Sequence, residues 1–332
     1  GMGTQLIRFV LHLDQSVADI ERLRDMTGGN PYFLSECVRS AKWITTGEKV
    51  TLPAENCNPP DSVISLVHDK LHGLEADSVL LIKAAAILGK KFCPDVLEEM
   101  TGMDVDRVAT ELDELISEGF LRVNPDIHPL GGYSFRHDIE REVILADLTP
   151  GQKRSLHLKA ARALQKRRAG FARFAEALAQ HWETALQENE ALNAWLEAGR
   201  YARSQFDRVE SYRVYGRGLD MVMKAPTLFP ENVVYELINE YGNYAFDRDD
   251  MVTCEKIYRG CLEIGEINQN RKLIGTAYNG LARAAFFRNE FEEARTCLER
   301  ASWFLEGTDL RVEQIKTLYV QGTIQYSVDD FT

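Results

Sequence analysis

Apolar residues recur at helical spacing along most of this chain, and the pattern predicts a protein built mainly from α-helices. In the N-terminal part, proline, glycine and asparagine residues break the pattern and predict a loop over residues 45–60. The helix before this loop should carry its apolar stripe from Phe33 to Ala41. The helices expected here span residues 5–13, 17–26, 31–44 and 61–71, the last capped by Asp61 or Ser62.

Residues 76–148 predict three apolar helices followed by two short strands. Gly89 should end the first helix and Gly119 the third, and alternating residues then predict a hairpin around a turn-rich stretch at 125–132. Three helices followed by a hairpin is the order of a winged-helix domain. The third helix is expected to bury Val105, Val108, Leu112, Leu115 and Ile116. The expected elements are helices 78–88, 94–100 and 104–118 and strands 120–123 and 133–135.

The chain beyond Pro150 is expected to be helical, and its last part repeats. Segments that begin at Gly242, Ala282 and Gly322 align at a regular spacing of 40 residues. Small residues at the expected helix contacts match the positions at which two antiparallel helices of a tetratricopeptide repeat pack closely. The best unit contains Tyr278, Leu281, Ala282, Ala285, Ala294, Leu298 and Ala301, and a weaker one contains Gly199, Ala202, Ser211, Tyr215 and Gly218. The last repeat stops before its second helix, and an uncapped array is expected to belong to a longer one.

Composition and charge exclude several classes of function. The chain has 332 residues, 45% of them hydrophobic, and a net charge of −12. It can therefore build cores, but it is a poor general binder of nucleic acid or anionic membranes. The third helix of the winged-helix region carries six acidic residues against one basic residue, Arg107. Since a recognition helix needs cations that contact phosphates, we expect no direct DNA binding.

No secretory or membrane-spanning segment is expected, because no apolar run approaches the length that crosses a bilayer. Gly1 before Met2 looks like a tag remnant, so the chain is interpreted as an expressed fragment. The six cysteines form no C-x-x-C pair and are interpreted as thiols in a reducing cytoplasm. A zinc site would need clustered His or Cys partners, which the sequence lacks, so we expect no metal site.

The stretch Thr27-Gly28-Gly29-Asn30-Pro31-Tyr32-Phe33-Leu34 is the most specific in the chain. Read locally, the glycines allow a sharp turn, Asn30 caps a helix, and Pro31 suits the first helical position. The string also closely resembles the glycine-asparagine-proline element in the helical lid of STAND proteins, the signal-transduction ATPases with numerous domains. The resemblance implies that residues 1–72 are the end of such a lid and that Gly29, Asn30 and Pro31 lie near bound nucleotide, with Pro31 close to the adenine.

A second string, Phe135-Arg136-His137-Asp138-Ile139, opens the helix that follows the expected hairpin. Read locally, it is a helix start at which His137 or Asp138 offers its side chain to a nearby backbone group. It also resembles the methionine-histidine-aspartate string of the STAND class, whose histidine contacts the β-phosphate of ADP in the closed state. His137 and Asp138 match, whereas Phe135 and Arg136 replace the usual residues. The resemblance implies a phosphate-sensing role for His137, and an imidazole suits it because it can donate a proton and gain charge.

A third string, Ala179-Gln180-His181-Trp182, resembles a signature that precedes the repeats in this family. We interpret His181 as a packing residue and not as a ligand. No phosphate-binding loop of the form G-x-x-x-x-G-K-[ST] occurs, and Gly89-Lys90-Lys91 lacks both the first glycine and the final hydroxyl. We therefore expect no catalytic residue and no ATP hydrolysis by this chain. The resemblance implies that ATP or ADP binds to a full-length parent, with only peripheral contacts from Gly29, Asn30, Pro31 and His137.

Without the core that would cover the nucleotide, some apolar surface near Pro31, Tyr32 and Phe33 is expected to be exposed or covered by a neighbouring molecule. His137 should be at least partly accessible, or bonded only to its own helix start. The two strings need not be close, because the lid and the winged helix can swing apart when no nucleotide bridges them.

These observations predict a mainly α fold: a helical lid remnant (1–72), a winged-helix domain with a small β-hairpin (73–148), connecting helices (149–190) and a tetratricopeptide-like α-solenoid (191–332). The first functional hypothesis is a regulatory fragment of a STAND-type ATPase. An upstream phosphate-binding core would be one partner, and a protein, peptide or small-molecule inducer on the repeats the other. The alternatives are a self-sufficient repeat scaffold for protein interactions and, third, a DNA-binding regulator. The sequence leaves the sensed ligand, the effector and the oligomeric state open.

Overall fold

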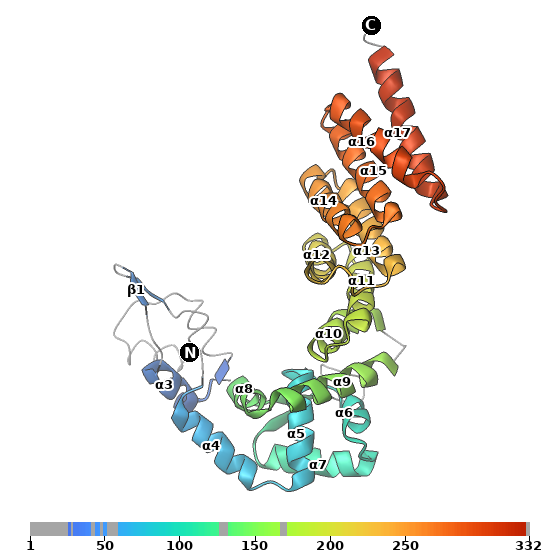
Figure 1. Ribbon diagram of the computed structural model, residues 1–332. Coiled ribbons are helices and arrows are strands. Elements are labelled where there is room, and N and C mark those ends of the chain that lie inside the picture. The colour runs from blue at the N-terminus through green and yellow to red at the C-terminus, as the bar shows by residue number, and fades with distance from the viewer. Residues whose placement is uncertain are drawn as a thin grey trace. The chain divides into compact units, whose positions relative to one another are not determined.

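The computed structural model describes residues 26–27, 29–40, 44–46, 49–51, 59–125, 132–166 and 171–329. The chain divides into two compact units, residues 1–167 and residues 168–332. The fold is mainly α, with a small β-hairpin in the first unit and helical repeats in the second, as the sequence predicted (Figure 1). The helix predicted for residues 5–13, and most of the one predicted for 17–26, lie outside the described residues.

The first elements of unit one differ from the prediction. Helix α3 (Pro31–Ser40) ends four residues before the predicted Ile44, because Ile44 begins strand β1 (Ile44–Thr46). This strand pairs antiparallel with β2 (Lys49–Thr51), with Ile44 opposite Thr51. The predicted loop over 45–60 was therefore wrong in its first residues. Helix α4 (Asp61–His72) starts at the predicted residue, but its N-cap is Pro60 and not Asp61 or Ser62.

Three helices and a three-stranded sheet follow. Helix α7 begins at an N-cap, Asp104, whose side chain accepts a hydrogen bond from the Arg107 amide. Gly119, at a φ of +75°, turns the chain from α7 into β4, a backbone conformation that favours glycine. Val105 is 62% exposed, so its predicted burial was wrong. The elements are α5 (Ala76–Leu88), β3 (Lys91–Phe92), α6 (Pro94–Thr101), α7 (Val105–Ser117), β4 (Leu121–Asn124) and β5 (Gly132–Phe135).

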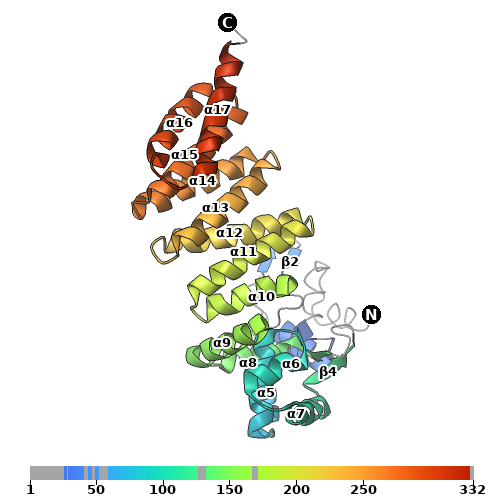
Figure 2. The same ribbon diagram turned by 90° about the vertical axis from the view of Figure 1, so that its right-hand side faces the viewer.

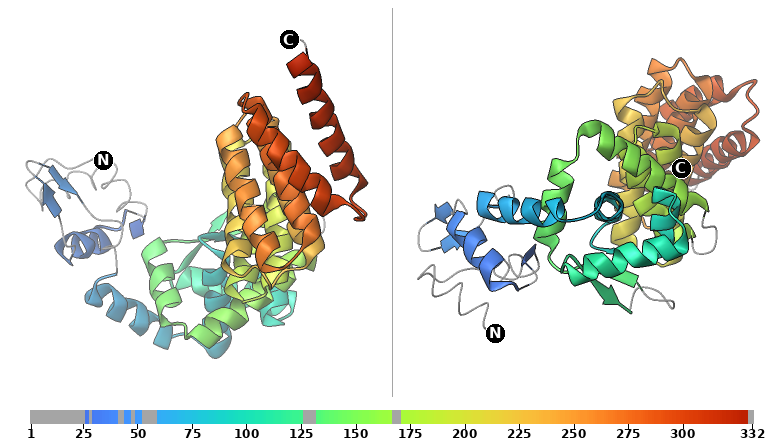
Figure 3. Two further views of the ribbon diagram at one scale, coloured as in Figure 1. Left: turned by 45° about the horizontal axis from the view of Figure 1, so that its top comes forward. Right: turned by 90° about the horizontal axis from the view of Figure 1, so that it is seen from below.

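Strand β3 was not predicted. It pairs with β5, and β5 pairs with β4, so the order across this antiparallel sheet is β3-β5-β4. Helix α5 lies at the centre of unit one, where it contacts α6, α7, α8 (Asp138–Asp147) and α9 (Pro150–Lys166) (Figure 3). Leu81, Ile82 and the three alanines at 84–86 are buried, which explains why this part of the helix is apolar on every side.

Unit two is a succession of antiparallel helices in which each packs on the next along the chain (Figure 2). Five of its turns share one construction. A non-glycine residue adopts a positive φ, and the next amide donates to a carbonyl five residues earlier, as from Asp207 to Ala202. The helices are α10 (Phe171–Thr184), α11 (Glu188–Ser204), α12 (Arg208–Lys224), α13 (Glu231–Phe246), α14 (Met251–Ile267), α15 (Arg271–Phe287), α16 (Phe291–Leu305) and α17 (Arg311–Asp329).

Glycines bring the repeat helices close together. A Cβ atom added to Gly280 of α15 would lie 2.3 Å from the ring of Tyr258 on α14, and one added to Gly242 of α13 would lie 2.3 Å from the hydroxyl of the same tyrosine. Gly199 of α11 admits the ring of Tyr215 in the same way. Of the glycines that the sequence marked as repeat positions, Gly199 and Gly242 are therefore contact points at which a large ring fills the space of a missing side chain, whereas an added Cβ at Gly322 would meet nothing within 4 Å.

Candidate functional site

The turn before α3 has the local geometry that the sequence predicted. Gly29 has a φ of +76°, and Pro31 is the first residue of the helix. The Asn30 side chain accepts a hydrogen bond from the Tyr32 amide at 2.9 Å, and the Asn30 amide donates to the Thr27 carbonyl at 3.1 Å. The turn is therefore stabilised by its own hydrogen bonds, one of which is accepted by the Thr27 carbonyl.

The same carbonyl receives the side chain of His137. The distance from His137 Nδ1 to Thr27 O is 2.8 Å, and the imidazole meets the ring of Phe33 edge-on at 5.1 Å between centroids. His137 is the N-cap of α8 but makes no side-chain capping bond. The local interpretation of His137 was therefore wrong, whereas the side chain is partly accessible, which is the first of the two outcomes expected for it. The structure brings the two strings together, although 110 residues separate the partners.

The hydrogen bond defines the chemical state of the imidazole. A carbonyl oxygen can only accept, so Nδ1 must carry the proton, and in the neutral ring Nε2 has a free lone pair. Burial lowers the pKa of His137 below its usual value, against the raising effect of the Thr27 bond. Positive charge on Lys70, Arg136 and Arg122 lowers this pKa further. At neutral pH the ring is therefore neutral, with Nε2 as its proton acceptor.

These cations give an acidic chain a positive corner. Lys70 is held by Glu140 and Arg122 by Ser134, at 2.7 and 3.1 Å, whereas the side chain of Arg136 is exposed beside His137. The three cations thus lie close enough to His137 to lower its pKa, although the chain as a whole has a net charge of −12.

The exposure of the turn agrees only in part with the expectation. Pro31 is exposed, and Tyr32 is 46% exposed. Phe33 is only 3% exposed, because it packs in the core of unit one and against His137. Some apolar surface near these residues is therefore exposed, as expected, but Pro31 and Tyr32 supply it and Phe33 does not.

Neither Lys70 nor Glu140, which complete this arrangement, stands in a recognisable motif, and Thr27 was marked only as the first residue of its string. Thr27, Lys70 and Glu140 take part through contacts that span 70 residues or more. Only the string around His137 could have directed attention to this helix turn.

Helix α7 does not offer a surface for DNA phosphates. Its acidic residues Asp106 and Asp113 are exposed. The guanidinium of Arg107 binds Asp77 and Glu111, with distances of 2.9 Å from Nη2 to each carboxylate. The basic side chain of this helix is therefore already paired within the domain.

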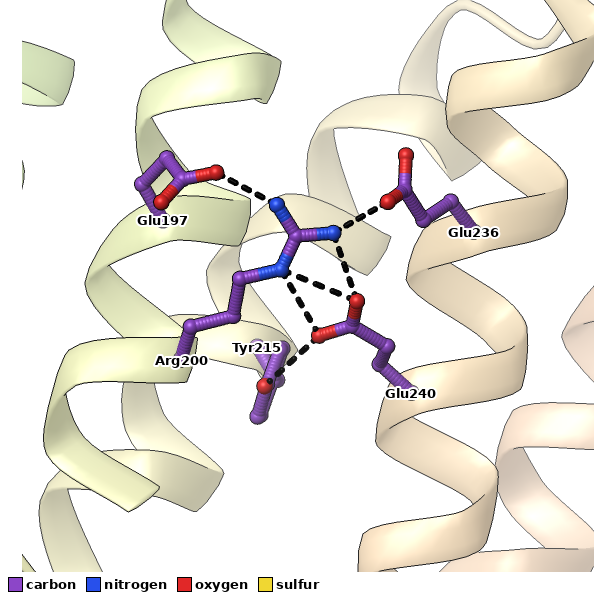
Figure 4. Close-up of polar contacts among 5 residues, drawn as sticks. All are labelled: Glu197, Arg200, Tyr215, Glu236 and Glu240. Carbon is purple, nitrogen blue, oxygen red and sulfur yellow. Dashed lines mark hydrogen bonds and ion pairs between the residues drawn. The ribbon is translucent and has the colours of Figure 1, made fainter. Parts of the chain in front are cut away.

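The repeat unit carries a second polar arrangement, centred on Arg200 of α11 (Figure 4). Its Nε donates to both carboxylate oxygens of Glu240 on α13, at 2.9 and 3.1 Å, and the Tyr215 hydroxyl donates to the same carboxylate at 3.2 Å. Arg200 also binds Glu197 and Glu236. These hydrogen bonds raise the pKa of Arg200, so the guanidinium stays charged.

Similar contacts continue along alternate helices. Arg283 of α15 meets Asn243 of α13 at 3.5 Å, and Asn279 of α15 donates to Glu313 of α17 at 2.7 Å. Together with the pair Arg200–Glu240 these residues form what we call the polar ladder. The polar ladder joins α11, α13, α15 and α17, and each of its residues lies on one of these four helices.

His181 of α10 is 7% exposed, in agreement with its interpretation as a packing residue. Among the residues described here, no group of three His, Cys, Asp or Glu side chains is placed to hold a metal ion. No helix in the described part of the chain is both long and apolar enough to cross a bilayer.

Neither a family model nor a curated protein matches the chain. It is similar to the solved structure of a signal transduction ATPase with numerous domains that has a tetratricopeptide repeat sensor, from Pyrococcus horikoshii. The two are 11% identical, with a TM-score of 0.31, and the match covers 98% of this chain. The chain spans 56% of the length of that protein. A likeness this weak carries no argument about function.

Proposed function

We propose that this chain is the regulatory part of a STAND-type signalling ATPase, in which the turn before α3 and His137 respond to bound nucleotide while the helical repeats bind a partner. The observation that carries the proposal is the hydrogen bond from His137 Nδ1 to the Thr27 carbonyl. It joins the two strings that resemble the nucleotide-contacting elements of that class.

The surroundings of this bond fit a nucleotide. Lys70, Arg136 and Arg122 make the corner positive, which suits a diphosphate. The free Nε2 of His137 can take up a proton and then donate to a phosphate oxygen. Pro31 offers exposed surface for a purine base. ADP would supply the charge that draws lid, winged helix and ATPase core into one inactive arrangement.

The repeats would carry the second input. A protein, peptide or small molecule bound across the polar ladder would contact helices from successive repeats at once. Its binding would favour one arrangement of these helices and, through the connecting helices, weaken the hold of ADP. We assign no ATP hydrolysis to this chain, and ATP or ADP would be bound mainly by the core of the full-length parent.

The test is the ADP affinity of the parent protein, which joins this chain to a phosphate-binding-loop domain. We expect His137→Ala to weaken ADP binding about tenfold or more and to raise basal signalling, because the inactive state loses a charged contact. The control is His157→Ala on α9, whose imidazole also has a pKa lowered by burial but lies on another helix. Unchanged ADP affinity and basal output in His137→Ala would overturn the proposed role.

A self-sufficient interaction scaffold is the second candidate. The polar ladder favours it, because the exposed carboxylates of Glu197 and Glu236, which bind the ladder residue Arg200, could contact a partner without any nucleotide. The two functions differ in one feature of the gene: the scaffold predicts an open reading frame without an upstream phosphate-binding loop. A third candidate, a DNA-binding regulator, is disfavoured by the acidic surface of α7, and a gel-shift assay with the intact chain tests it.

A further inference from the structure

The first turn of α8 contacts both ends of the segment that contains α3 and α4. His137 meets the Thr27 carbonyl at the start of this segment. Glu140 meets Lys70 near its end, with 2.7 Å between Oε1 and Nζ. Because residues three apart on a helix lie on the same side, one turn of α8 fixes both ends.

The segment is also closed on itself. The Ser62 hydroxyl of α4 donates to the carboxylate of Glu36 on α3 at 2.5 Å. This hydrogen bond joins the first turn of α4 to α3. Val63 and Val67 of α4 are fully buried in the core of unit one. A movement of α4 away from α8 would therefore carry α3 with it and pull the Thr27 carbonyl from His137.

The Lys70–Glu140 pair joins a partly exposed ammonium group, on a side chain that is 24% exposed, to a buried carboxylate that is incompletely satisfied. Glu140 is 1% exposed, and its Oε2 has no hydrogen-bond partner. Lys70 Nζ also lies 3.9 Å from the centroid of the Phe120 ring, so Lys70 has an aromatic face on one side and the carboxylate on the other. Burial raises the pKa of Glu140, and the charge of Lys70 opposes this shift.

We propose that the Lys70–Glu140 pair holds α4 on α8 and thereby keeps the Thr27 carbonyl on His137. A buried ion pair fixes position, since either charge without its partner is strongly unfavourable. The bare Oε2 makes the docked state less stable than an apolar contact of the same shape would be. Such a contact suits a docking that has to be released. The signalling meaning of this release rests on the proposed function, whereas the docking itself is a property of this chain.

The variant Glu140→Ala tests the proposal in the intact chain, with two measurements. The first is the pKa of His137 from an NMR titration. Loss of a negative charge alone would lower this pKa or leave it unchanged, whereas release of α4 exposes the ring and raises it toward the ordinary value. The second is backbone hydrogen exchange of residues 61–72, which we expect to become about tenfold faster or more.

Two further variants separate the pair from a general loss of charge or packing. Glu142→Ala removes an exposed carboxylate from the same helix, one that binds only Arg141, and should change neither measurement. The double variant Lys70→Met and Glu140→Leu replaces the pair by an apolar contact and should restore slow exchange.

Unchanged exchange and an unchanged or lowered pKa of His137 in Glu140→Ala would overturn the proposal. If Glu140→Ala unfolds unit one, Glu140→Gln replaces it, because it keeps the shape of the side chain. A smaller change in the same direction then supports the proposal, and no change overturns it. Neither measurement involves nucleotide, so this outcome is independent of the ADP experiment.

Discussion

Each of the two units is stabilised internally, and the contacts inside one unit differ in kind from those inside the other. In unit two, consecutive helices meet through small residues and rings, such as Gly280 under Tyr258, and the contacts are local in sequence. In unit one, the placement of α3 and α4 depends on polar contacts that join residues 70 to 110 positions apart, such as Lys70 with Glu140 and Thr27 with His137.

The difference separates a rigid part from a releasable one. A ring packed against a backbone has no alternative partner of equal quality, so the repeats should keep their internal packing until they unfold. The polar contacts of α8 can exchange their partners for water or an anion at small net free energy. Regulation by a nucleotide would therefore act where α8 meets residues 27–72.

The largest expected effect is in the repeats. In Gly280→Ala the new methyl group would lie 2.3 Å from the ring of Tyr258, which is buried and cannot move aside. We expect a loss of about 3 kcal/mol in the free energy of unfolding of unit two, measured with urea. Gly322→Ala is the control, since an added Cβ there meets nothing within 4 Å. Equal stability of the two variants would contradict the packing argument.

Removal of the imidazole should have a smaller effect, and in unit one. His137→Ala loses the bond to Thr27 and the ring contact with Phe33. We expect about 1–2 kcal/mol less protection of residues 31–40 in hydrogen exchange. His68→Ala is the comparison, because its pair with Asp147 is more than one third exposed on both sides and should contribute little. Unit two should not respond to either variant.

Removal of a helix cap in the repeats should change the free energy of unfolding of unit two by about 1 kcal/mol. The Asn270 side chain accepts hydrogen bonds from the amides of Lys272 and Leu273 at 3.0 and 3.1 Å. Asn270→Ala should therefore lower the stability of unit two by about 1 kcal/mol in urea. Glu290 occupies the same position before α16 but makes no capping bond, so Glu290→Ala should be nearly neutral. The opposite ranking would argue against the assigned caps.

The smallest effect is a dependence on pH confined to unit one. Because burial lowers the pKa of His137, the released form binds protons more readily than the docked form. Docking should therefore weaken as the pH falls below about 6.5 toward the lower pKa of the docked state. The raised pKa of Glu140 acts in the opposite sense, around more acidic pH. Comparison with His137→Gln in hydrogen exchange of residues 31–40 isolates the histidine, and an identical pH dependence of both chains would exclude it.

The same contrast explains what the sequence could predict. The repeats were predictable because spacing, small residues and turns are local signals, as with Ala282 and Ala285. Strand β3 was missed because it has only two residues and because these pair with Ser134 and Tyr133 of β5, far along the chain. The burial of Val105 was wrongly predicted because this residue fits the apolar spacing of α7 but is the first residue of the helix, where a side chain can point to solvent.

The candidate site was predictable only as two strings. The local cap at Asn30 and the helix start at His137 follow from short-range chemistry. Their meeting depends on the docking of α4, and neither Lys70 nor Glu140 carries a signal that would pair them. The sequence therefore marked the two strings, and the fold supplied the contact between them.

The most direct test of the account is the protonation state of the His137 ring, measured by the ¹⁵N chemical shifts of its two nitrogens in the intact chain. We predict a proton on Nδ1 and none on Nε2 at neutral pH, with a pKa below the ordinary value, because Nδ1 donates to the Thr27 carbonyl. A proton on Nε2 together with an ordinary pKa would show that His137 does not hold the turn before α3, and would contradict the account.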